Sequence, residues 1–178
     1  MSKILAFAGS NAKNSINYKL VEYTSNQLKE HSVDLVNFAH YPFPMYSIDL
    51  EQEEGFSNSL VELKNQINTA DGLILSVSEH NSMPSAYFKN VLDWLSRIER
   101  NFLENTKVLL LSTSPGKRGG MSAREAVGAL LPRFGAEVVA QYSLPSFGEN
   151  FSPETGVQGD EKDGYMEALK AFQDALAG

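Results

Sequence analysis

The chain has 178 residues, of which 42% are hydrophobic, and carries a formal net charge of −7 at pH 7. This length is typical of one domain with a substantial buried core, and the acidic charge argues against binding to nucleic acid, whose phosphates require many Lys and Arg contacts. Because the chain has no cysteine, disulfides, thiolate metal sites and cysteine nucleophiles are excluded.

Neither a membrane span nor a targeting signal is evident. No apolar run approaches the length needed to cross a bilayer, and the N-terminus lacks the apolar stretch and small-residue cleavage site of a signal peptide. We therefore expect residues 1–178 to form a single cytoplasmic domain with no membrane partner.

Short apolar runs alternate with segments of helical periodicity along the chain. The continuously apolar runs are typical of strands that are buried on both faces, whereas an alternating run indicates a half-exposed edge strand. Residues 39–55 are predicted to form a long turn-rich stretch, and Gly135 suits the position just after a helix. The predicted strands are 4–8, 32–38 (the alternating one), 72–77, 108–112 and 137–142, and the predicted helices lie across 20–28, 60–67, 88–95, 123–131 and 165–176.

Five strand–helix units of this kind predict an α/β fold with a parallel sheet covered by helices on both faces. Right-handed crossovers with one reversal of direction give a doubly wound sheet, for which we expect the strand order 2-1-3-4-5. Ligands of such sheets bind beyond the carboxyl ends of the strands near the reversal. The loops after the first, third and fourth strands are therefore the candidate site.

The loop after the first strand reads Gly9-Ser-Asn-Ala-Lys-Asn-Ser-Ile-Asn17 and leads directly into a helix. A helix N-terminus presents unpaired N–H groups and a partial positive charge, which favour an anion. Ser10, Ser15 and Asn17 add side-chain donors, and Lys13 adds a full charge. The alternative is that Ser15 only caps the helix. The spacings typical of nucleoside triphosphate and dinucleotide loops are absent.

The loop after the third strand reads Ser78-Glu-His-Asn-Ser-Met-Pro84. Polar residues at the end of a buried strand suit the edge of a flat heteroaromatic ring with alternating donors and acceptors. His80 is the only histidine at a strand's carboxyl end, although a turn residue without chemistry is the alternative. The chain has no G-x-S-x-G elbow and no pair of histidines at metal-binding spacing, which disfavours a hydrolase or a metalloenzyme.

The loop after the fourth strand reads Ser112-Thr-Ser-Pro-Gly-Lys-Arg-Gly-Gly120. Its glycines would let the backbone approach a planar ligand closely. Lys117 and Arg118 bring two positive charges to the rim. The alternative is a flexible glycine turn with two solvated charges.

Three motifs in this order resemble the NAD(P)H-dependent FMN reductase family. They are Gly9-Ser10 with Ser15 and Asn17, then Glu79-His-Asn81, then Phe88-Lys-Asn-Val-Leu-Asp-Trp-Leu-Ser96, and the resemblance extends from residue 3 to 147. The family has a flavodoxin-like fold and includes quinone, azo-dye and chromate reductases. Four positions depart from its usual pattern: Lys13 supplies the charge where Arg is common, Ser78 replaces a Pro, His80 replaces a Tyr, and Ser82 replaces a Gly.

The resemblance implies FMN as cofactor, NADPH or NADH as co-substrate and a small-molecule electron acceptor. It implies no catalytic side chain, because the flavin N5 carries the hydride chemistry. The implied FMN contacts fall in three groups. They are Ser10, Lys13, Ser15, Ile16 and Asn17 for the phosphate, Ser78, Glu79, His80 and Asn81 for the ring edge, and Ser114, Gly116 and Gly119 beside the ring.

Two other functions share this fold: a flavodoxin-type electron carrier, and a binding or regulatory module without flavin. The first loop lacks the T-x-T-G-x-T pattern expected of an electron carrier. The departures at Lys13 and His80 are the best support for a module without flavin.

The helix predicted around residues 88–95 carries two apolar stripes at about 100° per residue. The first is expected to pack on the sheet. The second needs another cover, which is either a second subunit or, within the same chain, residues 39–55 or a neighbouring helix. We expect a homodimer, or a tetramer, through the helix that carries Tyr87, Val91 and Trp94, and the resemblance implies the same. The first stripe is Phe88, Leu92 and Leu95, and the second is Tyr87, Val91, Trp94 and Ile98.

Overall fold

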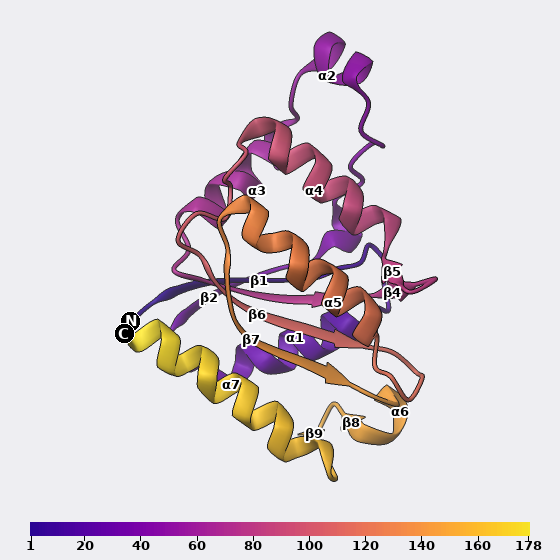
Figure 1. Cartoon of the computed structure of the whole chain (residues 1–178), viewed down its shortest axis with the longest axis vertical. Helices are drawn as coiled ribbons and strands as arrows, with labels where there is room; N and C mark the ends of the chain where they lie inside the picture. Colours follow the sequence, from indigo (N-terminus) through magenta and orange to yellow (C-terminus); the bar gives the residue numbers. More distant parts are fainter.

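A computed structural model describes all 178 residues and contains a five-stranded parallel sheet in the order β2-β1-β3-β6-β7 (Figure 1). Since β6 and β7 are the fourth and fifth strands of this sheet, the predicted order 2-1-3-4-5 and the flavodoxin-like fold are confirmed. The edge position predicted for the second strand is also correct. The strands are β1 (Lys3–Gly9), β2 (Ser32–Val36), β3 (Gly72–Val77), β6 (Lys107–Thr113) and β7 (Glu137–Leu144).

The two faces of the sheet bury separate cores, because successive side chains of a strand point to opposite faces. In β1, Leu5 and Phe7 join one core while Ile4, Ala6 and Ala8 join the other. Five helices cover these faces, three on the side of Leu5 and two on the side of Ile4 (Figure 1). They are α3 (Asn58–Asn68), α4 (Ala86–Ile98) and α5 (Met121–Leu130) on the first side, and α1 (Ile16–Gln27) and α7 (Glu161–Ala177) on the second.

Several short elements were not predicted, because they leave no apolar periodicity in the sequence. The largest is helix α2 (Ile48–Glu54), which buries no residue and therefore shows no apolar stripe. The prediction of a turn-rich stretch was wrong for these residues. Their helical signals are a Ser47 cap, a Gly55 end and acidic residues in the first turn. The other short elements are 3-10 turns at Phe38–His40 and Leu131–Phe134, helix α6 (Phe147–Asn150), the hairpin β4 (Glu79–His80) and β5 (Met83–Pro84), and the hairpin β8 (Phe151–Ser152) and β9 (Gly156–Val157).

The second stripe of α4 is covered by a segment of the same chain, residues 41–56, which we call the strap. Trp94 is only 2% exposed, and its indole N–H donates to the Pro44 carbonyl at 2.8 Å. The Tyr87 hydroxyl donates to the Tyr41 carbonyl at 2.7 Å, whereas Val91 is fully buried in the core on the Leu5 side of the sheet. The expectation that a second subunit covers this stripe is therefore wrong, and its alternative is confirmed. The α4 helix therefore leaves no exposed aromatic stripe that would require a second subunit.

Helix α2 lies at the outer end of the strap and extends away from the sheet (Figure 1). The longest helix, α7, has 17 residues and packs one side on the core through Tyr165, Leu169 and Phe172. None of the helices combines the length and apolar composition that crossing a bilayer requires.

Candidate functional site

The carboxyl ends of β1, β3 and β6 lie side by side at one edge of the sheet. Gly9 pairs with Val77, and Val77 pairs with Ser112, so that the three strands end at the same level. In Figure 1 their arrowheads point to the side where the β4–β5 hairpin and α6 lie. The three loops singled out from the sequence therefore meet at this edge, as the strand order predicts.

The first loop presents a row of unpaired backbone donors. The N–H groups of five residues between positions 11 and 17 have no acceptor within the protein. Residues 11–14 are exposed, and Lys13 forms no ion pair. Because unpaired N–H groups at a helix start bind anions, this loop suits a phosphate. The five residues are Asn11, Lys13, Asn14, Ile16 and Asn17.

Ser15 combines the two functions that the sequence left open. Its hydroxyl oxygen accepts from the Tyr18 N–H at 3.2 Å and so caps α1. The hydroxyl proton is not used in this contact and is available for a ligand. Ser10 supports the same loop, since its hydroxyl oxygen accepts from the Ala12 N–H at 3.3 Å.

The side chain of Asn17 holds the fold instead of facing a ligand. It is 2% exposed; its Nδ2 donates to the Thr113 carbonyl at 3.1 Å and its Oδ1 accepts from the Thr113 N–H at 3.0 Å. The same oxygen accepts from the Ser76 hydroxyl at 2.7 Å. This corrects the expectation that the Asn17 side chain donates to a ligand, because its polar atoms are already engaged. Only its backbone N–H remains available.

The second loop is the β4–β5 hairpin, which is anchored on β1. The hydroxyls of Ser78 and Ser85 both donate to the Gly9 carbonyl, at 3.3 and 2.7 Å. The turn residues Asn81 and Ser82 have φ values of 53° and 64°, which is the left-handed conformation of a tight hairpin turn. The Asn81 N–H has no acceptor and His80 is exposed, so both can face a ligand at this edge.

Glu79 is engaged with a different part of the chain. Its Oε2 accepts from the Ala123 N–H at 3.0 Å and thereby caps the start of α5. One carboxylate oxygen of Glu79, a residue expected to contact a ring edge, is therefore engaged with α5. Sequence periodicity gave no sign of this cap, because Glu79 and Ala123 are 44 residues apart.

The third loop is shaped by its own backbone. The Ser114 hydroxyl oxygen accepts from the Gly116 N–H at 3.2 Å, whereas the Ser114 N–H has no acceptor. Gly119 has a φ of 58°, and a Cβ there would lie 2.6 Å from the Leu144 carbonyl oxygen. Gly119 is thus required by close packing of two backbones. Of the glycines predicted to let a ligand approach, Gly116 is exposed and is the better placed.

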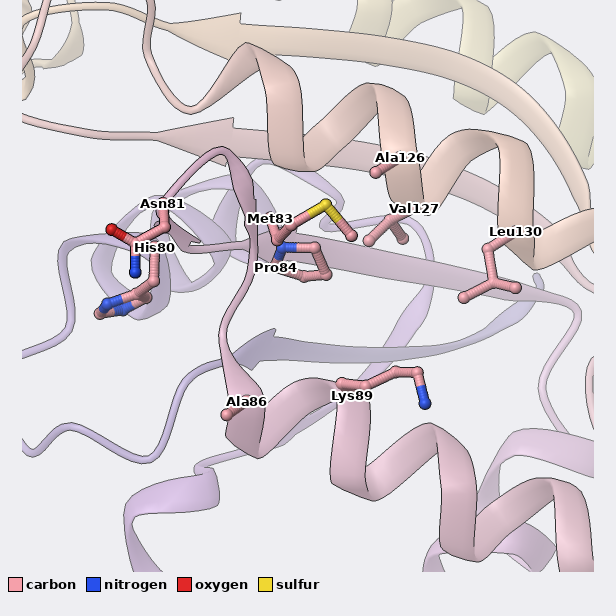
Figure 2. Close-up of a pocket in the computed structure, with 9 residues that line it drawn as sticks. All are labelled: His80, Asn81, Met83, Pro84, Ala86, Lys89, Ala126, Val127 and Leu130. Atoms are coloured by element: carbon pink, nitrogen blue, oxygen red, sulfur yellow. The ribbon is translucent and has the colours of Figure 1, made fainter.

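A cavity of about 350 Å³ lies between the hairpin, α4 and α5 (Figure 2). Met83 extends from the hairpin toward Ala126 and Val127 of α5 in Figure 2. Of the predicted site residues only His80 and Asn81 line this cavity, and its apolar walls were not predicted as part of the site. Its lining residues are His80, Asn81, Met83, Pro84, Ala86, Lys89, Ala126, Val127 and Leu130.

The fold and the first loop together define a flavodoxin-like protein with a row of unpaired backbone donors at the sheet edge. Residues 2–149 match the NADPH-dependent FMN reductase family, and the chain belongs to that family. The match includes all predicted site residues. It confirms the resemblance, and the description of the family names FMN and NADPH.

Individual relatives agree with this assignment. A quinone reductase of Escherichia coli (strain K12) is 39% identical over 77 residues, which cover 43% of this chain and only 41% of that protein's length. An NADPH azoreductase of Bacillus sp. (strain OY1-2) is 28% identical over 129 residues, or 72% of this chain and 68% of that protein. FerB, a flavoenzyme NAD(P)H:(acceptor) oxidoreductase from Paracoccus denitrificans, has a TM-score of 0.79 at 22% identity and covers 99% of this chain and 98% of its own. That structural likeness shows the fold alone.

Proposed function

We propose that the chain is an FMN-dependent oxidoreductase that passes hydride from NADPH or NADH to the flavin and then to a quinone-like or other small acceptor. The observation that carries the proposal is the set of N–H groups without acceptors between residues 11 and 17. The names of the quinone reductase and azoreductase relatives support the class of acceptor.

The residues at the sheet edge fit the two ends of FMN. The phosphate would be held by the free N–H groups of the first loop, by the Ser15 hydroxyl and by the Lys13 ammonium. The ring edge would be held by the N–H groups of Asn81 and Ser114, which also have no acceptor in the protein. Bound FMN supplies the hydride and electron transfer, so the chain's own contribution is binding, orientation and electrostatics.

The charge distribution favours phosphorylated ligands at this edge in spite of the net charge of −7. Lys13, Lys117 and Arg118 are exposed and none of them forms an ion pair with a carboxylate. Arg118 is held near the rim because its Nη2 donates to the Ser122 hydroxyl at 3.1 Å. Local positive charge of this kind attracts phosphates even on an acidic protein. We propose that Lys117 and Arg118 meet the phosphates of the nicotinamide nucleotide.

The test begins with the purified protein and FMN. We expect a yellow complex of one FMN per chain, a melting temperature that rises with added FMN, bleaching by NADPH or NADH without oxygen, and return of the colour when a quinone is added. A colourless protein whose melting temperature does not change with excess FMN would overturn the proposal. FMN bound but not bleached by either nucleotide would favour an electron carrier.

The oligomeric state has no structural support in α4 and rests on the resemblance alone. We propose a homodimer, which sedimentation of the purified protein at micromolar concentration tests directly. A monomer under these conditions would contradict it.

A further inference from the structure

Helix α5 has no side-chain cap from its own N-cap residue. That residue is Gly120, which has no side chain to accept a hydrogen bond, and the first turn of the helix contains no acidic residue. The Glu79 carboxylate takes this place, since its Oε2 accepts from the Ala123 N–H at 3.0 Å. A Cβ on Gly120 would lie 3.6 Å from the Glu79 Cβ, so the Glu79 side chain packs directly over the start of the helix.

This contact joins two loops of the proposed site. Glu79 belongs to the hairpin that offers the Asn81 N–H, and α5 begins where the loop of Ser114 ends. The two ends of that loop are tied together by the Ser112 hydroxyl, which donates to the Gly119 carbonyl at 2.7 Å. The hairpin is also anchored on the Gly9 carbonyl, and the Glu79 carboxylate links it to the start of α5.

The contact also places a negative charge at the positive end of a helix dipole. The start of a helix carries about half a positive charge, which an adjacent carboxylate offsets. Reduction of FMN by two electrons and one proton at neutral pH leaves one additional negative charge on the ring. A carboxylate at this edge therefore disfavours the reduced ring, and the bare end of α5 would favour it.

We propose that Glu79 is a positioning residue that acts through the first turn of α5. It fixes the hairpin against the third loop, and its charge sets the reduction potential of bound FMN. This inference rests on the proposed function. It assigns to the Glu79 side chain a role that does not involve touching the cofactor.

Two substitutions separate geometry from charge. Glu79→Gln keeps an oxygen that can accept from Ala123 but removes the charge, whereas Glu79→Ala removes both. Glu125→Gln is the matched control, because Glu125 is exposed on the same helix and makes no hydrogen bond or ion pair. The measurements are hydrogen exchange of the Ala123 N–H in the cofactor-free protein, the dissociation constant of oxidised FMN and its midpoint potential.

In Glu79→Ala we expect exchange of the Ala123 N–H to accelerate roughly five- to tenfold, as loss of a helix cap predicts, and binding of FMN to weaken. In Glu79→Gln we expect exchange and FMN binding close to wild type. The preference for reduced over oxidised FMN should rise about tenfold, which is about 30 mV for a two-electron couple. Glu125→Gln should leave all three quantities at the wild-type values.

The outcomes distinguish this inference from the proposed function. Wild-type protein that takes up no FMN would overturn both. Bound FMN with the same potential in Glu79→Gln and wild type would overturn the role of the charge while the proposed function stands. Unchanged exchange of the Ala123 N–H in Glu79→Ala would overturn the cap.

Discussion

The side chain of Asn17, at the start of α1, pairs with the backbone of Thr113 at the end of β6. It accepts from the Thr113 N–H at 3.0 Å and donates to the Thr113 carbonyl at 3.1 Å. A side-chain amide satisfies both groups of a peptide in this way, and the Ser76 hydroxyl on β3 completes its bonds. One buried residue therefore links the first loop to the two strands that carry the other loops.

Replacing this residue should destabilise the whole domain. In Asn17→Ala the buried groups of Thr113 and Ser76 lose their partners, and we expect the free energy of unfolding to fall by about 2–4 kcal/mol. Urea unfolding followed by circular dichroism measures the change. Asn26→Ala is the control, since Asn26 is exposed on the same helix, and should change stability by less than about 0.5 kcal/mol. Equal effects of the two substitutions would contradict the assignment.

Lys13 should discriminate FMN from riboflavin. Its ammonium is exposed beside the free N–H groups of the first loop, and only FMN carries a phosphate for it to contact. In Lys13→Ala we expect the affinity for FMN to fall about tenfold, in keeping with the loss of one charge-assisted contact, and the affinity for riboflavin to stay the same. Fluorescence titration of both flavins measures this.

Lys19→Ala provides the matched control for charge, because Lys19 is exposed further along α1. It should affect neither flavin. A loss of equal size for FMN and riboflavin in Lys13→Ala would mean that Lys13 does not contact the phosphate.

The hairpin turn carries strain at Ser82, whose φ is 64°. Glycine adopts this left-handed conformation without the steric penalty of a Cβ. We therefore expect Ser82→Gly to raise the free energy of unfolding by about 0.5–1 kcal/mol. Ser82→Ala removes the hydroxyl but keeps the Cβ and should give no gain. Thermal unfolding of both variants and of wild type measures these differences in stability. Stabilisation by Ser82→Ala would show that the effect comes from loss of the hydroxyl and not from the backbone conformation.

The strap should loosen in acid. Arg97 donates to Glu51 at 2.8 and 3.1 Å, and these hydrogen bonds hold the pKa of Glu51 below its ordinary value of 4.5. A lowered pKa in the folded state means that the ionised form stabilises the attachment of α2. This stabilisation is complete well above pH 4.5 and is lost as the pH falls below that value.

Trp94 reports on this change, since it is the only tryptophan and its indole N–H donates to the strap. We expect its fluorescence to change below pH 4.5 in wild type, and Glu51→Gln to show the loosened signal already at neutral pH. Glu53 is an exposed neighbour on α2, and Glu53→Gln should show the same change of Trp94 fluorescence with pH as wild type. Identical fluorescence of Glu51→Gln and wild type from neutral to acid pH would show that the ion pair does not hold the strap.

The sequence by itself determined the sheet, its order and the edge at which the three loops meet. Strands buried on both faces must be continuously apolar, and helices that cover them must repeat their apolar residues at helical spacing, so both leave a local pattern. The loops of Ser10, Ser78 and Ser114 follow from that pattern, because strand ends in a parallel sheet lie at one edge.

Only the tertiary structure decided what individual polar side chains do within those loops. Asn17 and Glu79 were expected to face a ligand, yet their side chains bind backbone groups 96 and 44 residues away. The cover over Trp94 likewise comes from Pro44, 50 residues earlier. A polar side chain pairs with whichever buried backbone group the folded chain brings within about 3 Å, and that proximity has no periodicity in the sequence.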